Sequence, residues 1–144
     1  MSAHDLYREV ILAHAQAPHN TGALPDACCK THRDNPTCGD AIDLHADIHD
    51  GVIVDIRYES AGCAISTASA SMMTDAVKGI SSVEAAQLLA NFRAFITTGD
   101  ALDPALEELE ALEGVRQLPA RVKCALLAWR ALEDVLAEER TEGS

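Results

Sequence analysis

AIDLHADIHDGVIVDIRYE, residues 41–59, contains two segments in which apolar and polar residues alternate strictly. In the first, one face carries Ile42, Leu44, Ala46 and Ile48; in the second, one face carries Val52, Val54, Ile56 and Tyr58. Alternation with a period of two is typical of strands that bury one face. Between the segments, Asp50-Gly51 is a favoured pair for a tight hairpin turn. The stretch therefore predicts an antiparallel β-hairpin.

The segments around this hairpin have mainly helical patterns. Helices are expected over residues 4–17, over 64–78 after Gly62-Cys63, over 81–95 with a capping box, over 105–112 up to Gly114, and over 119–138 from Pro119. Residues 24–34 are ambiguous and compatible with a short first strand, whereas residues 141–144 are expected to be disordered. We predict one α+β domain, residues 1–144, in which helices pack on one face of a small antiparallel sheet and a metal site lies at one end.

Length and composition set the broad class of protein. The chain has 144 residues, of which 48% are hydrophobic but only 3% aromatic, so an aliphatic core is expected. No apolar run approaches the ~18 residues of a transmembrane helix. The first residues lack the basic and apolar regions of a signal peptide. These features favour a cytoplasmic protein without a membrane partner.

The balance of charge argues against a nucleic-acid partner. There are 11 Lys and Arg against 23 Asp and Glu, giving a formal net charge of −12. A protein that binds the phosphate backbone needs a basic face, and base stacking needs aromatic side chains. Much of the acidic charge falls in the late helices, where we interpret it as solvated surface; a docking surface for a basic partner is the weaker alternative.

Five cysteines, an odd number, favour metal or thiol chemistry over a disulfide framework. Cys38 lies in the loop sequence NPTCGD (35–40), Cys63 at the expected helix start in AGCAIS (61–66), and Cys124 on the last helix in RVKCA (121–125). Asp40 adds a carboxylate. Three thiols and a carboxylate brought together by folding form a soft metal site, and each thiol is also a candidate sulfur acceptor.

Each of these cysteines has a local feature that suits this chemistry. Gly39 lets the backbone turn so that Cys38 and Asp40 can face one centre. A helix start lowers the pKa of a thiol such as Cys63, although a small buried residue in a packing contact is the alternative. Arg121, one helical turn before Cys124, offers a cation that offsets the negative charge of the ligands.

Other candidate residues carry weaker signals. Lys123, beside Cys124, is either a second cation for the site or a solvated surface residue. The neighbours Cys28 and Cys29 have no metal-like surroundings, and their role stays open. The six histidines show no paired ligand spacing and are interpreted mostly as surface residues.

Together these motifs resemble the NifU/IscU-like family of iron–sulfur cluster assembly proteins, nearly from end to end. The resemblance rests on Leu6-Tyr7, Val10-Ile11, His14, Pro18, Asn20 and Gly22 near the start, on the loop 35–40, on Gly62 to Met73, and on Pro119 to Trp129. Within the family the chain resembles the SufU branch, because it departs from the IscU pattern in two places. Lys123 stands where IscU-type proteins have a histidine, and the segment between Cys63 and Cys124 is longer. In place of the chaperone-recognition motif Leu-Pro-Pro-Val-Lys stands Gln117 to Arg121.

The resemblance implies a zinc-dependent sulfur acceptor, a sulfurtransferase-like carrier, that works with a SufS-type cysteine desulfurase and a downstream Suf assembly complex. By position, Zn²⁺ would be held by Cys38, Asp40, Cys63 and Cys124, Cys38 would accept the sulfur, and Arg121 would support the site. An IscU-like scaffold that holds iron or a [2Fe–2S] cluster on the same ligands is the alternative. A zinc-stabilised adaptor without sulfur transfer is a third, and the lack of a Cys-x-x-Cys pair disfavours a dithiol oxidoreductase.

Overall fold

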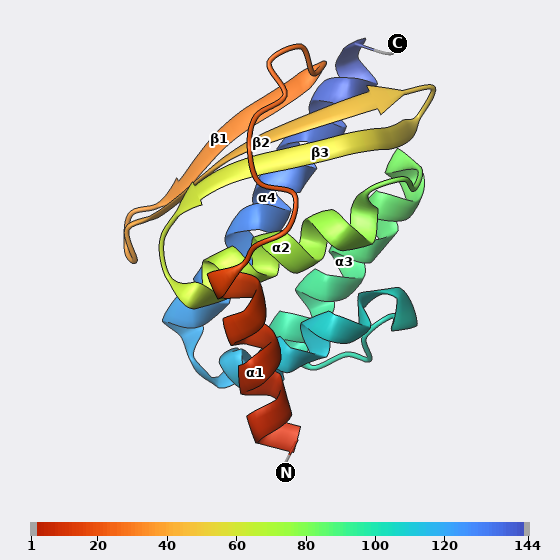
Figure 1. Cartoon of the computed structure of the whole chain (residues 1–144). Coiled ribbons are helices and arrows are strands. Elements are labelled where there is room, and N and C mark those ends of the chain that lie inside the picture. Colours follow the sequence, from red (N-terminus) through yellow and green to blue (C-terminus); the bar gives the residue numbers. More distant parts are fainter. Residues whose placement is uncertain (1–2, 143–144) are drawn as a thin grey trace.

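The computed structural model describes residues 3–142 of the chain (Figure 1). Its elements are, in order, α1 (Ala3–Gln16), β1 (Cys29–Asn35), β2 (Asp40–His49), β3 (Val52–Ala61), α2 (Ala64–Val77), α3 (Ser82–Thr98), the 3₁₀ helix η1 (Pro104–Gln117) and α4 (Pro119–Glu142). The three strands form one antiparallel sheet in the order β1-β2-β3. This is the α+β class that the sequence predicts.

The predicted hairpin is confirmed as β2 and β3, which pair from Ala41 opposite Ala61 to His49 opposite Val52. Asp50 and Gly51 both have positive φ, 52° and 76°, as a two-residue hairpin turn of this kind requires. The predicted face of the second strand is wrong at its start, because the register shifts beside Ile48. This irregularity buries Ile53 completely and leaves Val54 46% exposed.

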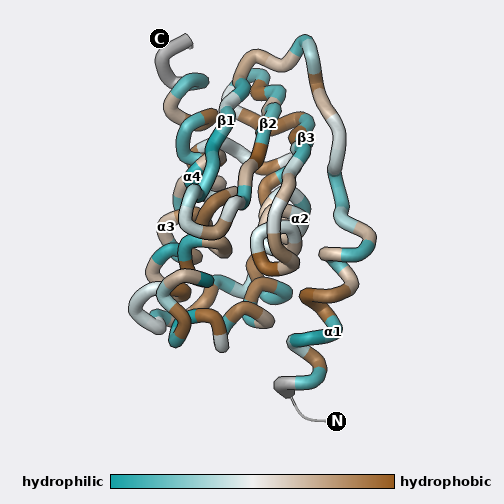
Figure 2. Tube along the Cα trace, turned by 90° about the vertical axis from the view of Figure 1, so that its left-hand side faces the viewer, coloured by the Kyte–Doolittle hydropathy of each residue, from teal (hydrophilic) through white to brown (hydrophobic). Residues whose placement is uncertain are grey.

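The first strand is shorter than the range 24–34 that the sequence left open. Residues 25 and 26 form a turn, closed by a hydrogen bond from the Ala27 amide to the Leu24 carbonyl, and Pro25 has no amide hydrogen to add to a sheet. Residues 17–28 instead run as an extended strap from α1 to β1 (Figure 2). The strap is attached to the sheet where the Leu24 amide donates to His45 Nδ1 at 2.8 Å.

Helices cover one face of the sheet, with α4 packed on β1 and β2 and α2 on β3 (Figure 1). The core between them is mainly aliphatic, as the composition predicts, and its aromatic contact is a stack of Phe92 on Trp129 with 4.7 Å between ring centroids. Ser69 connects α2 to α4, because its hydroxyl donates to the Ala125 carbonyl at 2.6 Å and accepts from Trp129 Nε1 at 3.2 Å. These contacts fix the positions of the two helices that carry Cys63 and Cys124.

The helical region between α3 and α4 is longer than predicted. Asp103 caps η1 by accepting from the Ala105 amide at 2.9 Å, and the helix continues past Gly114 to Gln117. Four of its five buried residues recur at every third position, Leu106, Leu109, Leu112 and Val115, and the fifth is Ala111. A three-residue repeat matches the 3₁₀ helix, so burial of Val115 carries the helix through the glycine that was expected to end it.

The last helix also extends further than predicted. The backbone of α4 is helical to Glu142, so the expected disorder is wrong for residues 141 and 142, while residues 143 and 144 lie outside the described part. A helix that continues with one face packed needs no separate stop signal at residue 138. Among residues 3–142, no helix is both long and apolar enough to cross a membrane.

Candidate metal and thiol site

The structure brings the four predicted ligands to the end of the sheet where the β1–β2 loop and the starts of α2 and α4 lie close together. Cys38 lies in the loop between β1 and β2, and Asp40 is the first residue of β2. Cys63 is the N-cap of α2, and Cys124 lies in the second turn of α4. Four residues that are separated by up to 86 positions along the chain therefore meet where two strands, a loop and two helix starts converge.

The loop presents the Cys38 thiol at the surface. The amides of Cys38 and Gly39 both donate to the Asn35 carbonyl, at 3.1 and 2.9 Å, and Gly39 adopts a left-handed φ of 73°. This tight turn leaves Cys38 exposed, with its Sγ 3.7 Å from the Ala120 carbonyl oxygen at the start of α4. Cys38 is the member of the set that another molecule can reach most directly.

Asp40 is held in place by the backbone of the next ligand. Its side chain is buried, and its Oδ1 accepts a hydrogen bond from the Cys63 amide at 2.9 Å. A Cβ atom on Gly62 would lie 2.2 Å from that same oxygen, so glycine is required there by the close approach of the carboxylate. The sequence Gly62-Cys63 thus supplies both a ligand and the space for another ligand.

Cys63 caps the start of α2 through its own side chain. Its Sγ accepts from the Ser66 amide at 3.5 Å, while Ser66 Oγ donates to the Cys63 carbonyl at 3.0 Å. These two bonds fix the Cys63 side chain at the first turn of α2. The same Sγ lies 3.9 Å from Asp40 Oδ2.

Cys124 completes the set from the side of α4. It is fully buried, and one ligand atom from each of Cys38, Asp40 and Cys124 lies within 4.8 Å of the others. Burial, followed by the neighbouring Asp40, Cys38 and Cys63, raises the pKa of the Cys124 thiol well above its usual range. This shift has a clear cause: the anionic form is desolvated and crowded by other acidic groups.

Arg121 is the cation at this site. Charge interaction with Cys63 first, then with Cys124 and Cys38, raises the pKa of its guanidinium. The side chain is exposed, so it lies over the thiols on the solvent side. Lys123 lies beside the site, where it lines a cavity of about 250 Å³ together with Arg33, Asn35 and Arg130. The structure therefore distinguishes the two cations that the sequence placed near Cys124.

The donor set suits a soft or borderline divalent ion. Three sulfurs and one carboxylate oxygen are donor types that zinc accepts in its four-coordinate protein sites, and thiolates also suit iron–sulfur chemistry. Asp40 and Cys124 are buried whereas Cys38 is exposed, so the set combines a fixed inner part with an accessible outer thiol. The residues present therefore fit Zn²⁺.

Two other groups of side chains come together that the sequence did not connect. Cys28 and Cys29 lie at the far end of β1, with 2.7 Å between their sulfurs. His14, His19 and Asp75 form a second cluster of metal-ligating side chains, and His14 is buried, contrary to the expectation for most histidines. Histidines in different elements leave no spacing signal, so sequence reasoning missed this cluster.

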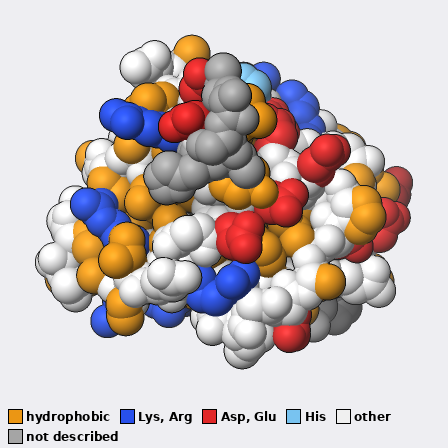
Figure 3. All heavy atoms as spheres, turned by 90° about the horizontal axis from the view of Figure 1, so that it is seen from below, with side chains coloured by type: hydrophobic (Ala, Val, Ile, Leu, Met, Phe, Trp, Pro, Cys, Tyr) orange, Lys and Arg blue, Asp and Glu red, His pale blue; other side chains and the backbone are white. Residues whose placement is uncertain are grey.

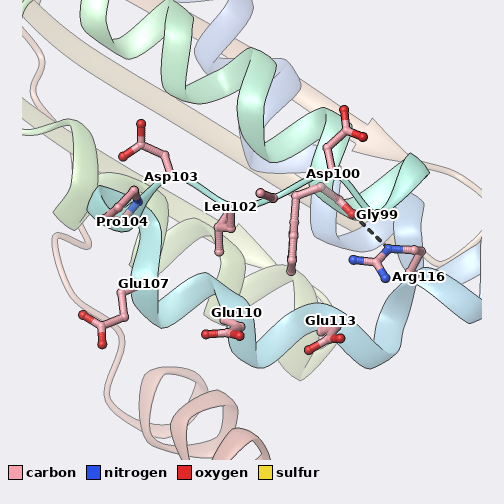
Figure 4. A pocket seen from close by; sticks show the side chains of 11 residues that line it. Gly99, Asp100, Leu102, Asp103, Pro104, Glu107, Glu110, Glu113 and Arg116 are labelled. Carbon is pink, nitrogen blue, oxygen red and sulfur yellow. Dashed lines mark hydrogen bonds between the residues drawn. The ribbon is translucent and has the colours of Figure 1, made fainter.

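A larger cavity lies away from both groups of side chains. This cavity of about 520 Å³ lies between η1 and the loop before it, where Figure 4 shows Glu107, Glu110 and Glu113 on the helix and Arg116 bonded to the backbone of the preceding segment. That bond is from Arg116 Nε to the Phe95 carbonyl, at 2.9 Å. On the face seen from below, acidic side chains are concentrated in the centre and on the right, whereas most of the basic ones lie on the left (Figure 3).

Comparisons with known proteins point to one family. The family model described as NifU-like N-terminal domain matches residues 6–141. The zinc-dependent sulfurtransferase SufU of Bacillus subtilis is 42% identical over 136 residues, which cover 93% of this chain and 91% of that protein. The iron–sulfur cluster assembly scaffold protein IscU of Streptococcus pyogenes is 42% identical over 134 residues, which cover 91% and 82%.

A solved structure supports the same fold. The iron–sulfur cluster assembly scaffold protein for the SUF system from Fervidobacterium islandicum superimposes with a TM-score of 0.83 at 30% sequence identity. The match covers 94% of this chain and 99% of that one. The overall arrangement of sheet and helices is therefore shared with that protein.

Proposed function

Because the chain belongs to the NifU-like N-terminal domain family, we propose that it acts in iron–sulfur cluster assembly as a zinc-dependent sulfur acceptor. The likeness to a zinc-dependent sulfurtransferase over nearly the whole of both chains supports this function. The observation that carries it is the exposed thiol of Cys38 beside the buried Asp40 and Cys124. An acceptor needs one sulfur that a donor enzyme can reach and a fixed set of groups behind it.

In this proposal Cys38, Asp40, Cys63 and Cys124 hold the zinc ion. When bound, zinc keeps coordinating thiols deprotonated near neutral pH and has no redox chemistry of its own. The chain holds the ligands ready by its own contacts: the Cys63 amide orients Asp40, and Ser66 orients Cys63. Arg121 offsets the negative charge that three sulfurs and a carboxylate concentrate at one point.

The transfer itself is a thiol exchange at Cys38. The Cys38 thiolate attacks the outer sulfur of a cysteine persulfide on the donor enzyme, so a new Sγ–S bond forms on Cys38. The S–S bond of the donor persulfide breaks, and the donor cysteine leaves as a thiolate. The outer sulfur changes carrier with its oxidation state unchanged, so no external oxidant or reductant is needed. The donor chemistry is that of a SufS-type cysteine desulfurase, and the receiving partner is a cluster assembly complex.

Metal analysis and intact mass measurement test this proposal. We expect one zinc per chain as purified, and a gain of one sulfur atom after incubation with the desulfurase and L-cysteine. Cys38→Ala should abolish the persulfide and the stimulation of desulfurase turnover, whereas Cys28→Ala should leave both unchanged. A Cys38→Ala protein that still carries the added sulfur and stimulates turnover would overturn the assignment of the acceptor.

A cluster scaffold is the second candidate function, because the same ligands suit a [2Fe–2S] unit and several relatives are named as scaffold proteins. Anaerobic reconstitution with iron and sulfide separates the two. A stable visible chromophore with equal iron and sulfide, formed while zinc is displaced, favours the scaffold. Retention of zinc without a chromophore favours the sulfur acceptor.

A further inference from the structure

A second cluster of ligating side chains joins four elements on the side of α1. His14 comes from α1, His19 from the strap, Asp75 from α2 and Glu108 from η1. One ligand atom from each of His14, His19 and Asp75 lies within 4.8 Å of the others, and the two imidazole rings are 4.7 Å apart between centroids. Segments that precede the three strands in the chain and segments that follow them therefore meet at one small group of nitrogen and oxygen atoms.

His14 is the buried centre of this cluster. It is 4% exposed, its Nδ1 lies 2.6 Å from Ser71 Oγ, and its Nε2 lies 3.0 Å from Glu108 Oε2. A ring nitrogen bonded to a fixed hydroxyl sets the orientation of the other nitrogen, which is how proteins commonly orient a histidine ligand. Ser71 also accepts from the His19 backbone amide at 2.9 Å, so one hydroxyl positions both histidines.

Asp75 is oriented in the same way from its other oxygen. Its Oδ2 lies 2.6 Å from His19 Nδ1, and its Oδ1 accepts from Asn20 Nδ2 at 2.9 Å. Asn20 also donates to Thr74 Oγ1 at 3.0 Å, which holds the amide in place. The His14 ring and the Asp75 carboxylate are each supported by a side chain outside the cluster, and His19 is held through its backbone amide, which is the organisation of a metal site with outer-shell partners.

Space for an ion is available at the outer edge of the cluster. The side chain of Glu108 is 59% exposed, so it can move aside from His14 Nε2. A cavity of about 280 Å³ is lined by both Asp75 and Glu108, which gives an entry route and room for water ligands. The ring nitrogens of His14 and His19 are hydrogen-bonded to the carboxylates of Glu108 and Asp75. A bound cation would take the place of the shared hydrogen atoms, with the same nitrogen and oxygen atoms as its ligands.

We propose that His14, His19, Asp75 and Glu108 form a binding site for a divalent transition-metal ion, separate from the thiol site. Imidazole and carboxylate ligands suit Zn²⁺, Co²⁺, Ni²⁺ and Fe²⁺, whereas the sulfur-rich site prefers softer partners. Cys63 and Asp75 are 12 residues apart on α2. At 1.5 Å per residue the two sites lie roughly 18 Å apart, so one ion cannot bridge them.

Cobalt titration of the zinc-loaded protein tests this site, because Co²⁺ reports its ligands by absorption. We expect a second equivalent to bind with weak visible d–d bands and without the intense near-ultraviolet absorption of cobalt–sulfur bonds. His19→Ala and Asp75→Asn should each weaken this binding at least about tenfold, as loss of a ligand costs no less than loss of an outer-shell partner. His32→Ala is the matched control, since His32 is exposed and also faces two carboxylates, Asp34 and Asp43.

Two further measurements keep the test decisive. Paramagnetic shifts of imidazole protons in the unaltered protein should identify His14 and His19 without any substitution. Glu108→Gln, at the exposed rim, should weaken binding less than Asp75→Asn and leave the far-ultraviolet circular dichroism unchanged. The proposal is overturned if cobalt at concentrations up to about 1 mM does not bind to the zinc-loaded protein, or if it binds only to sulfur ligands. It is also overturned if His32→Ala weakens cobalt binding as much as His19→Ala does.

Discussion

The thiol site and the histidine cluster lie at opposite ends of α2, and their side chains are positioned by different kinds of contact. At the thiol site, backbone geometry positions the ligands: Cys63 is a helix cap, and Asp40 fits against Gly62 and a backbone amide. In the histidine cluster, side chains position one another through Ser71 and Asn20. The thiol site therefore depends on the conformation of the backbone, whereas the histidine cluster depends on contacts between side chains.

The two regions also differ in charge. Arg121 and the N-terminus of α2 place positive charge beside the thiols, although the protein carries a formal net charge of −12. In the histidine cluster, imidazoles are paired with carboxylates. The charged groups next to each site, and not the net charge of the protein, therefore set the electrostatic environment at each end of α2.

The largest expected effect follows from removing a ligand of the thiol site. Cys63→Ser should lower zinc affinity by more than the ~10–100-fold that loss of an outer-shell partner costs, because a neutral hydroxyl replaces a thiolate. Cobalt binding at the histidine cluster should be unchanged. Competition with a chromophoric chelator measures the first, and a parallel loss at both sites would contradict their independence.

Crowding at Gly62 disturbs the thiol site without replacing any ligand residue. In Gly62→Ala the new Cβ overlaps Asp40 Oδ1 and the backbone has a φ of 154°, so we expect a loss of about 1–3 kcal/mol in the free energy of unfolding and weaker zinc binding. Gly39→Ala is the control, because its φ is 73° but no atom lies within 4 Å of the added Cβ. That variant should lose about 1 kcal/mol. Equal zinc affinities in the two variants would show that the overlap is relieved.

A smaller effect is expected from the cation. Arg121→Gln removes positive charge beside three sulfurs, which disfavours their thiolate forms. The pH profile of iodoacetamide alkylation in the zinc-free protein should therefore move to higher pH. Arg130→Gln, on the same helix but beside the neighbouring cavity, should leave the profile in place. An unchanged profile in Arg121→Gln would show that solvent screens this charge.

The smallest effect is expected from an ion pair that joins β1 to α4. Arg33 on β1 forms a bidentate pair with Asp134 on α4, at 2.7 and 2.9 Å, and this pair lowers the pKa of Asp134. A lowered pKa gives stability that is present above the ordinary value of about 3.9 and is lost as the pH falls through the folded-state value. Because both side chains are partly exposed, Asp134→Asn should cost less than about 1 kcal/mol at neutral pH.

Urea denaturation over a pH series checks this prediction. The difference in unfolding free energy between Asp134→Asn and the unaltered protein should shrink as the pH falls below about 4 and should also shrink in high salt. Glu133→Gln, which removes an exposed partner of Arg93 at 3.3 Å, serves as the comparison and should show a smaller difference. A difference that grows on acidification would contradict the sign of the Asp134 shift.

Local sequence patterns determined the elements and the chemistry of the thiol site. Alternation with Asp50-Gly51 defined the hairpin, and the residue types at 38, 40, 63 and 124 defined a soft donor set, because strand period and ligand softness are properties of the residues themselves. The bulge that exposes Val54 and the 3₁₀ helix that continues past Gly114 were not predicted. They depend on the burial of Ile53 and Val115 in the core, which local patterns do not show.

Only the tertiary structure decided which distant groups meet. It placed Arg121 over the thiols but Lys123 beside a separate cavity, although both flank Cys124 in the sequence. It also buried His14 between Ser71 and Glu108, which are 57 and 94 residues away. Such contacts arise from the packing of whole helices and from the path of the strap, and packing between distant segments leaves no period or spacing in a single sequence.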